Sequence, residues 1–341
     1  MSGGLGTVGT HTATIDYQGL ADKQTMSHST HISRLAPSPT GALHLGNAYA
    51  FLVNWALAQQ NGWGLVLRID DLDGPRTKKG ADELAIKDLE WLGLDWTGLP
   101  YYQSENLPGY ASALDQLKSN EMIYPCTCSR KQIEQVQAAP HGNEHELRYP
   151  GTCRPLSTSG FLPPPADKSI AWRLVVSEQP VEFDDQVHGH QVINIQKEVG
   201  DFVVSTKEGL PAYQLAVVVD DFKQKVSHIV RGDDLLPSTG RQILIYRMLG
   251  LSPLPHYYHL PIVCGPDGRR LAKRHGDSRV AFYREKGISP FRVVGLIAFW
   301  CRITEQRQLM SASEFAGQFR LELVPHNRIT FTYEDEQWLC G

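Results

Sequence analysis

The sequence lacks any apolar run close to the roughly 18 residues that a helix needs to cross a bilayer. Residues 1–30 also lack the basic start and the apolar segment of a secretory signal peptide. The expected location is therefore the cytoplasm, without membrane contact. Of the six cysteines, three are grouped at 126, 128 and 153 and three are scattered. In a cytosolic chain this pattern suggests one metal site and not a disulfide framework.

No strong excess of either charge is present, because 33 Lys and Arg stand against 37 Asp and Glu, a net charge of -4. A nucleic-acid partner would have to be bound by a local basic patch. The sequence also has no internal repeat, and its composition is that of an ordinary globular protein with two or three domains. No long heptad pattern calls for a second copy, so a monomer is expected.

The first residues differ in composition from the rest. Residues 1–31 are rich in Gly, Ser, Thr and His and have no apolar period, which predicts a disordered leader. Alternatively, translation starts at Met26.

Helix-like and strand-like patterns then alternate, which predicts an α/β fold with a doubly wound parallel sheet. Apolar spacing and capping signals predict helices over 48–60, 81–92, 107–120, 238–249 and 291–301, and a short helix after the Ser129–Gln132 capping box. Strands are expected over 64–70, 171–176, 181–184, 192–195, 201–206, 215–219, 229–233 and 257–263.

The stretch from Arg34 to Asn47 joins an apolar run to a Pro-rich turn and a helix start. The first backbone N–H groups of a helix lack intrahelical partners and carry the positive end of the helix dipole, so they can hold a phosphate. Gly41 and Gly46 allow a ligand to approach the backbone. The alternative from this stretch alone is an ordinary turn that caps a helix.

Two further polar segments follow. Asp70, Asp71 and Asp73 come at the end of an expected strand, where the ligand crevice of a parallel sheet usually lies. The Gly-rich loop 265–276 carries four basic side chains. By itself that loop is equally well explained as a solvated run of surface charge.

Together these segments resemble the class I aminoacyl-tRNA synthetases of the glutamyl type. His44-Leu-Gly-Asn47 resembles their first signature, H-I-G-H, and Arg270-Leu-Ala-Lys-Arg274 resembles the second, K-M-S-K-S. Arg-x-Ala-Pro-Ser-Pro-Thr-Gly precedes the first and Gly-Pro-Asp-Gly precedes the second, and the resemblance spans residues 32–295. It implies a Rossmann-type catalytic domain.

Three details resemble the shortened paralogues of that family, the glutamyl-queuosine tRNA(Asp) synthetases. Only a short region follows Arg274, a Cys-x-Cys…Tyr-x-x-x-Cys pattern resembles their zinc site, and the phrase Tyr-Pro-Gly-Thr-Cys-Arg is present. The implied reaction uses ATP to activate L-glutamate to glutamyl-adenylate without tRNA, and transfers glutamate to the queuosine base in the anticodon loop of tRNA(Asp). The alternatives are a truncated glutamyl-tRNA synthetase that charges a tRNA 3′ end and a non-catalytic RNA-binding relative.

The resemblance also implies residue roles. Glutamate would be bound by Arg34, Ser38, Asp70, Tyr213 and Arg231. ATP, with Mg²⁺, would be bound by His44, Gly46, Asn47 and Lys273, and the catalytic residues would be His44, Lys273 and Arg274. Asp70 stands where the bacterial family usually has glutamate, and Arg270 and Ala272 depart from the second signature.

One structural zinc ion is expected. From the residues alone, its ligands would be Cys126, Cys128 and Cys153 with either His141 or His145. The resemblance instead favours Tyr149 as the fourth ligand. The alternative is a group of three unligated thiols.

These features predict five segments. Residues 1–31 would be the leader and 32–124 the first half of the catalytic domain. The inserted zinc-binding subdomain would cover 125–190 and the second catalytic half, with the K-M-S-K-S-like loop, 191–277. A short, mainly helical C-terminal region would cover 278–341.

Overall fold

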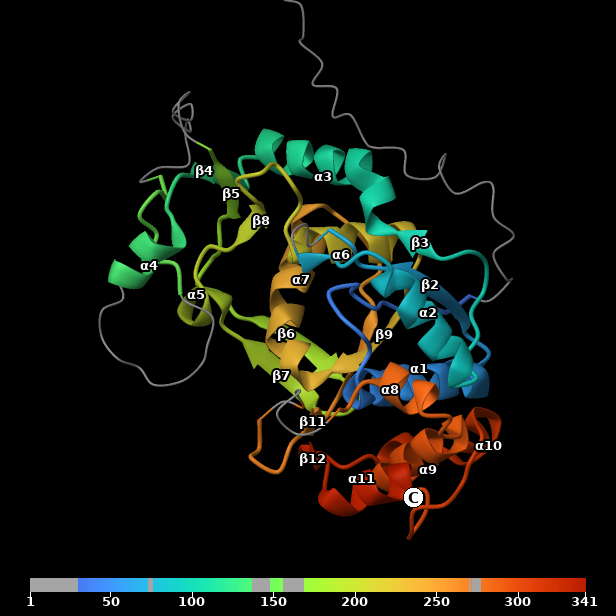
Figure 1. Cartoon of the computed structure of the whole chain (residues 1–341). Helices are drawn as coiled ribbons and strands as arrows, with labels where there is room; N and C mark the ends of the chain where they lie inside the picture. Colours follow the sequence, from blue (N-terminus) through green and yellow to red (C-terminus); the bar gives the residue numbers. More distant parts are fainter. Residues whose placement is uncertain (1–29, 73–75, 137–147, 156–168, 270, 272–276) are drawn as a thin grey trace, which may run out of the picture.

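The chain forms a mixed α/β structure in which helices cover short sheets (Figure 1). The computed structural model describes residues 30–72, 76–136, 148–155, 169–269, 271 and 277–341. Residues 1–29 of the leader expected over 1–31 therefore lie outside the described residues, as do Asp73, His141, His145, Arg270, Ala272, Lys273 and Arg274.

The helices are α1 (Leu45–Asn61), α2 (Ala81–Trp91), α3 (Leu107–Ser119), α4 (Arg130–Val136), α5 (Ile195–Glu198), α6 (Tyr213–Lys223), α7 (Leu236–Met248), α8 (Val280–Glu285), α9 (Pro290–Trp300), α10 (Ala312–Gln318) and α11 (Tyr333–Cys340). The strands are β1 (Ile32–Leu35), β2 (Gly64–Ile69), β3 (Tyr101–Tyr102), β4 (Ile123–Cys126), β5 (Ala171–Leu174), β6 (Val181–Asp185), β7 (Gly189–Ile193), β8 (Val203–Ser205), β9 (His228–Gly232), β10 (His256–Leu260), β11 (Val263–Cys264) and β12 (Ile329–Thr330). No helix in this described part is long and apolar enough to span a membrane.

Parallel strands form the centre of the molecule, as the alternating pattern predicts. One sheet has the order β1-β2-β3 and another the order β7-β6-β10-β9, with β10 parallel to both β6 and β9. β1 lies beside β9, where the Ser227 N–H donates to the Ile32 carbonyl at 2.8 Å. The carboxyl ends of β1, β2, β9 and β10 therefore point to one region of the surface.

A smaller antiparallel sheet, β4-β5-β8, stands to one side with α4 (Figure 1). The capping box expected at Ser129 is confirmed, since the Gln132 N–H donates to Ser129 Oγ and the Ser129 N–H donates to Gln132 Oε1. The boundary expected at residue 190 falls inside β7, which pairs with β6 in the central sheet. The division into five segments stays a prediction.

The strand expected over 215–219 is wrong. This stretch lies inside α6, of which eight residues are buried, Asp220 and Asp221 included. A helix that is apolar on all sides shows no 3.6-residue period, and the Val217-Val218-Val219 run favours a strand in isolation. Burial against α3 and α7 overrides that local preference.

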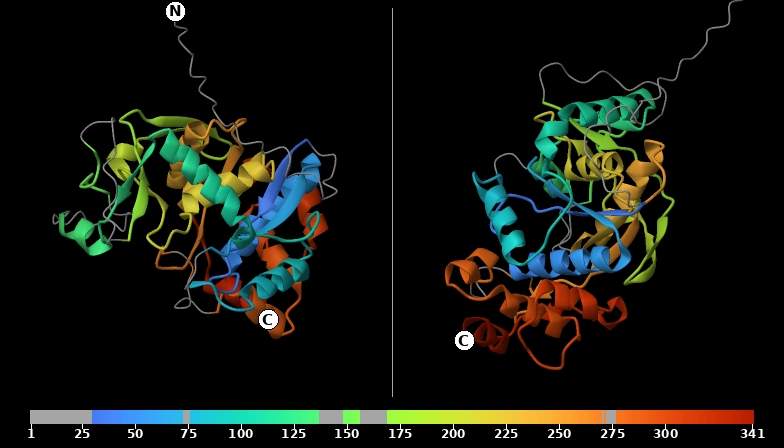
Figure 2. Two further views of the ribbon diagram at one scale, coloured as in Figure 1. Left: turned by 90° about the horizontal axis from the view of Figure 1, so that it is seen from above. Right: turned by 90° about the vertical axis from the view of Figure 1, so that its right-hand side faces the viewer.

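Two hydrophobic clusters hold these layers together. One packs α1 and β2 against the C-terminal helices, and the other packs α3, α6 and α7 against β9 and β10. The right-hand view in Figure 2 shows α1 between the parallel strands and the C-terminal helices. With its middle packed on both sides, α1 presents its N-terminus at a fixed position beside the strand ends.

Candidate active site

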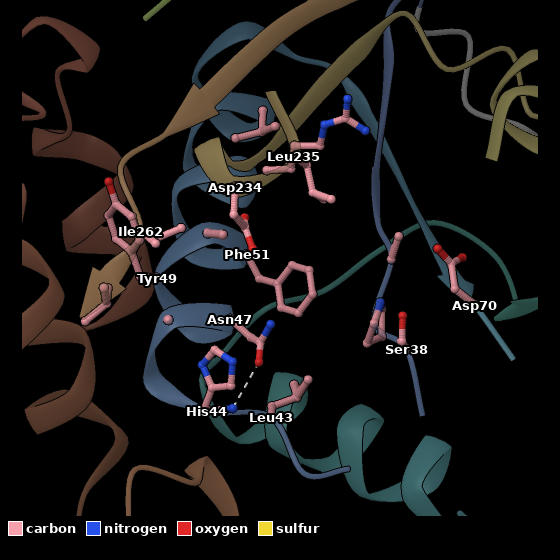
Figure 3. A pocket seen from close by; sticks show the side chains of 18 of the residues that line it. Ser38, Leu43, His44, Asn47, Tyr49, Phe51, Asp70, Asp234, Leu235 and Ile262 are labelled. Carbon is pink, nitrogen blue, oxygen red and sulfur yellow. Dashed lines mark hydrogen bonds between the residues drawn. The ribbon is translucent and has the colours of Figure 1, made fainter. Parts of the chain in front are cut away.

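A cavity of about 450 Å³ opens at the carboxyl ends of the central parallel strands. Eight residues that the sequence predicts for glutamate or ATP line it together: Arg34, Ser38, His44, Gly46, Asn47, Asp70, Tyr213 and Arg231. Figure 3 shows Ser38 and Asp70 on one side of the cavity and His44 and Asn47 on another. Elements separated by almost 200 residues thus meet at the sheet edge where ligands of α/β proteins usually bind.

The N-terminus of α1 forms one wall of the cavity. The His44 N–H donates to Asn47 Oδ1 at 3.1 Å, and the Leu45 N–H donates to the Ser278 carbonyl at 2.9 Å, which fixes the helix start. The first turn holds no acidic side chain. A Cβ at Gly46 would lie 3.1 Å from the His44 ring, so glycine allows close packing here. A phosphate at this helix start would meet the positive end of the helix dipole.

The opposite wall is built on a buried network of two arginines and two aspartates. Arg34 Nε donates to Asp221 Oδ1 at 3.2 Å. Arg68 Nη1 donates to the same Asp221 oxygen at 2.6 Å, and Arg68 Nε donates to Asp70 Oδ1 at 2.7 Å. The network thus contains equal numbers of positive and negative groups. Each carboxylate is held by at least one guanidinium, as buried charges require.

Asp70 is oriented by Arg68 towards the cavity. Burial raises the pKa of Asp70, and the Arg68 guanidinium opposes that shift. Only its Oδ1 is engaged by Arg68, so its Oδ2 remains to accept a hydrogen bond from a ligand. A carboxylate in this position suits an ammonium group.

Arg231 lies in a second buried cluster with different partners. Its Nε donates to His259 Nε2 at 3.0 Å and its Nη2 donates to Thr239 Oγ1 at 2.7 Å. Its Nη1 is buried without a hydrogen-bond partner, and no carboxylate pairs with Arg231 within the described residues. Buried donors are rarely left unsatisfied, so this nitrogen fits a ligand oxygen in the cavity.

His259 completes the second cluster as a neutral ring. Its Nδ1 lies 2.7 Å from Asp185 Oδ2, and the whole side chain is buried. Burial lowers the pKa of His259 to about 4, although the hydrogen bond with Asp185 opposes the shift. The neutral tautomer with the proton on Nδ1 donates to Asp185 and accepts from Arg231. Burial likewise lowers the pKa of Arg231, so an anion in the cavity would stabilise its charged form.

Sequence reasoning missed the residues that hold the site together. Arg68, Asp221, Asp185 and His259 carry no motif, yet all four are buried and orient residues of the cavity. A signal existed for Arg68, because a charged side chain inside an apolar strand must find a buried partner. The Asp220-Asp221 pair directly follows the strand expected over 215–219, whereas the structure places both residues on α6.

The cysteine cluster lies apart from the cavity wall, beside the small sheet. The sulfurs of Cys126, Cys128 and Cys153 all lie within 4.8 Å of one another. Tyr149 Oη lies 3.5 Å from Cys126 Sγ and 3.7 Å from Cys128 Sγ. Although burial raises the pKa of Cys153, hydrogen bonds from the Thr127 backbone and from Tyr149 and Cys128 lower it to about 7.

This donor set fits a tetrahedral metal ion with three sulfurs and one oxygen. The fit supports Tyr149 as the fourth ligand, while the alternatives His141 and His145 lie outside the described residues. The remaining cysteines, at 264, 301 and 340, do not join this cluster.

Comparisons with known proteins agree with this architecture. A family model of the catalytic domain of class I tRNA synthetases (E and Q) matches residues 32–338. A Glutamyl-Q tRNA(Asp) synthetase from Rhodopirellula baltica is 47% identical over 277 residues, which cover 78% of this chain and 83% of that protein. Another from Symbiobacterium thermophilum is 42% identical over 318 residues, covering 90% of this chain and 98% of that protein.

Longer ligases are similar as well. The Glutamate--tRNA ligase of Aquifex aeolicus is 38% identical over 313 residues, which cover 91% of this chain and 66% of the ligase. The crystal structure of a glutamate tRNA ligase from Elizabethkingia meningosepticum, in complex with its amino acid, superposes with a TM-score of 0.75 at 26% identity. That match covers 91% of this chain and 68% of the solved one.

Proposed function

Since the chain belongs to the class I tRNA synthetases for glutamate and glutamine, as a ligase related to the Glutamyl-Q tRNA(Asp) synthetases, we propose that it activates L-glutamate with ATP and transfers it to queuosine in tRNA(Asp). Glutamate activation, the first half of this proposal, is supported by the unsatisfied Nη1 of Arg231, which lines a cavity that also presents the Asp70 carboxylate. The names of the relatives support the second half.

In this proposal glutamate is bound by charge complementarity. Arg231 receives one carboxylate and Asp70 receives the ammonium, while Tyr213 and Ser38 offer hydroxyl groups from the cavity wall. The charge of Arg34 is already balanced by Asp221. Arg34 can therefore donate hydrogen bonds to glutamate and add positive potential, but it adds less net charge to the cavity than Arg231 does. An apolar amino acid would leave Arg231 buried and unpaired, and should be rejected strongly.

ATP with Mg²⁺ is the second substrate, placed with its phosphates at the start of α1. The α-carboxylate of glutamate attacks the α-phosphorus, the glutamyl-adenylate anhydride forms, and pyrophosphate leaves. No protein nucleophile is needed, because in-line positioning and charge stabilisation lower the barrier. We assign these tasks to His44, Gly46 and Asn47 on one side and to Lys273 and Arg274 on the other.

The cysteine cluster would hold one structural zinc ion through Cys126, Cys128, Cys153 and Tyr149. Such an ion ties β4 to the segment before β5 and takes no part in the reaction. Metal analysis of carefully purified protein should find about one equivalent of zinc, and less than about half an equivalent contradicts the site. Cys128→Ser should lose the ion, whereas the exposed Cys340→Ser should retain it.

One experiment separates the proposal from its alternatives. The protein is incubated with ATP and labelled glutamate, and then with queuosine-containing tRNA(Asp), the same tRNA without queuosine, or tRNA(Glu). Label on the first RNA alone supports the proposal. Label on tRNA(Glu) supports a glutamyl-tRNA synthetase that charges a 3′ end, the alternative favoured by the similarity to glutamate–tRNA ligases. Absence of glutamate activation supports a non-catalytic RNA-binding relative.

A further inference from the structure

In the described part of the chain, Arg173 is a buried cation with which no carboxylate pairs. The residue is 8% exposed. Its Nη1 donates to the Asp201 main-chain carbonyl at 2.8 Å, and its Nε donates to Cys126 Sγ at 3.3 Å. The Asp201 carboxylate instead accepts from Arg154 Nη1 at 3.1 Å and from Tyr124 Oη at 2.7 Å. Arg173 therefore has no described counter-ion, although a buried charge normally has one.

The pairing of β4 with β5 places Arg173 against the cysteine cluster. Arg173 lies directly opposite Tyr124 in this antiparallel pair, and Ala171 lies opposite Cys126. Residues two positions apart on a strand point to the same face, so Arg173, Tyr124 and Cys126 share one face of the small sheet. The Arg173 guanidinium also covers the Tyr149 ring, with its central carbon 3.7 Å from the ring centroid. One guanidinium thus contacts two of the four proposed metal ligands.

A metal ion held by this cluster would benefit from a cation beside its ligands. Three thiolates exceed the charge of Zn²⁺, so the loaded site is negative, and a tyrosinate ligand adds a further negative charge. With protons on the ligands in place of the ion, the empty site carries less negative charge. Cys126 and Tyr149 are both buried, so water screens this charge poorly. A fixed cation at Arg173 therefore stabilises the loaded site more than the empty one.

We propose that Arg173 is the positioning residue of the metal site, where its charge balances the thiolates and its contacts orient Cys126 and Tyr149 for the ion. A hydrogen bond to a ligand sulfur and a planar cation on a ligand ring fix both donors before the ion binds. A lysine at this position would supply the charge without the planar face. This inference rests on the zinc ligands proposed above and not on the reaction proposed for the cavity.

The test measures the zinc affinity of Arg173→Met by competition with a chromophoric chelator. We expect the Kd for zinc to rise about 10–100-fold, the usual effect of losing a group that orients metal ligands. The matched control is Lys207→Met. Lys207 Nζ donates to the Thr127 carbonyl at 2.7 Å, beside the same cysteines, and makes no hydrogen bond to a sulfur within the described residues. The Kd of this control should stay within about threefold of the wild-type value.

Cobalt(II) in place of zinc reports on the ligand sulfur directly. Loss of the hydrogen bond from Arg173 Nε leaves the electrons of the Cys126 sulfur less stabilised, so they transfer more easily to the metal. The sulfur-to-cobalt charge-transfer band of Arg173→Met should therefore move to longer wavelength. Its ligand-field bands should keep the pattern of a tetrahedral ion, because the four ligands are unchanged. A general loss of stability would lower the amount of bound cobalt without moving the band.

Other outcomes overturn the inference. A zinc Kd of Arg173→Met within about threefold of the wild-type value rejects it, and so does a charge-transfer band at the wild-type wavelength. Should Arg173→Met fail to fold, Arg173→Lys is compared with Arg173→Gln. The lysine variant should then bind zinc more tightly, and equal affinities reject the role of the charge.

The failure of this inference can be told apart from the failure of the proposed function. A wild type that binds neither zinc nor cobalt rejects the metal site and, with it, the role of Arg173. A zinc-bound wild type that does not activate glutamate rejects the proposed reaction alone, because the metal affinities are measured without any substrate.

Discussion

The two arginines on the walls of the cavity, Arg34 and Arg231, are both more than nine-tenths buried but differ in what balances their charge. Arg34 pairs directly with Asp221 and shares that carboxylate with Arg68. Among the residues that the structure describes, Arg231 forms side-chain hydrogen bonds with the neutral partners His259 and Thr239, and Asp185 lies beyond the His259 ring. The fold thus neutralises Arg34, whereas no described carboxylate pairs with Arg231, to which the proposed function assigns a substrate carboxylate.

Under the proposed function, this difference predicts that Arg34 serves stability and that Arg231 serves binding. Replacing one member of a paired cluster leaves a buried charge without a partner, which is strongly destabilising. Replacing an arginine without a counter-ion removes a buried charge and leaves none behind. Burying Arg231 without a described counter-ion should therefore lower the stability of the free protein, and under the proposed function glutamate would offset that loss on binding.

The largest effect on stability should come from Arg68→Leu. This variant leaves Asp70 without its guanidinium partner and removes one of two from Asp221, so the free energy of unfolding should fall by about 3–5 kcal/mol. Urea denaturation measures it, with exposed Arg247→Leu as the control. In Arg231→Leu the loss should be below about 1 kcal/mol, since no carboxylate loses a direct partner. If both variants lost the same free energy of unfolding, the distinction between the paired cluster of Arg68 and the unpaired Arg231 would be wrong.

The largest effect on activity should come from the same Arg231→Leu variant. Its kcat/KM for glutamate in pyrophosphate exchange should fall by about 10²–10³-fold, because the substrate carboxylate loses its buried cation. The KM for ATP should stay close to that of the wild type. A larger change in the KM for ATP than in the kcat/KM for glutamate would show that Arg231 contacts the nucleotide instead.

A moderate effect should appear with pH, because only the Arg231 cluster contains a histidine. The pKa of His259 is lowered to about 4 in the folded protein, from an ordinary value of 6.5. Between these values the unfolded chain binds more protons, so stability falls as the pH falls. From pH 6.5 to 5 this group should cost about 2 kcal/mol in the free energy of unfolding.

Urea denaturation at the two pH values measures this loss. His259→Asn should lack the corresponding part of it, and His326→Asn, at an exposed position, should retain it. If His259→Asn lost as much stability as the wild type between the two pH values, the proton uptake would belong to another group.

The smallest effect should come from Tyr213→Phe. The Tyr213 side chain is 43% exposed on the cavity wall and can offer glutamate a single hydroxyl. The loss of one neutral hydrogen bond is worth about 0.5–1.5 kcal/mol, so kcat/KM for glutamate should fall less than about 15-fold. A loss as large as that of Arg231→Leu would make Tyr213 an equal partner in recognition.

Local signals were enough to predict much of the fold. The helices α1 and α7 begin and end within a few residues of their expected bounds, because their apolar spacing is followed by the left-handed glycines Gly62 and Gly250. The α6 helix was assigned wrongly because its surroundings, and not its own pattern, decide its structure. The antiparallel β4-β5-β8 sheet was not expected either, since strand pairing over 30 or more residues leaves no local signal.

For the cavity, motifs predicted several residues that line it but not those that orient them. Arg34, Ser38 and Asp70 belong to recognisable phrases, and the structure brings them together with Arg231. Arg68 and His259 act through contacts between distant strands and helices, so only the tertiary structure reveals them.

The two adjacent aspartates of α6 should make this helix rigid. Asp220 accepts hydrogen bonds from Tyr101, Gln103, Asn106 and Tyr110, whereas Asp221 pairs with arginines of β1 and β2. Two neighbouring carboxylates therefore anchor one helix to two different parts of the chain. The α6 helix should be among the slowest segments in amide hydrogen exchange. Because folding has already ordered the wall that carries Tyr213, binding glutamate should cost little further conformational entropy.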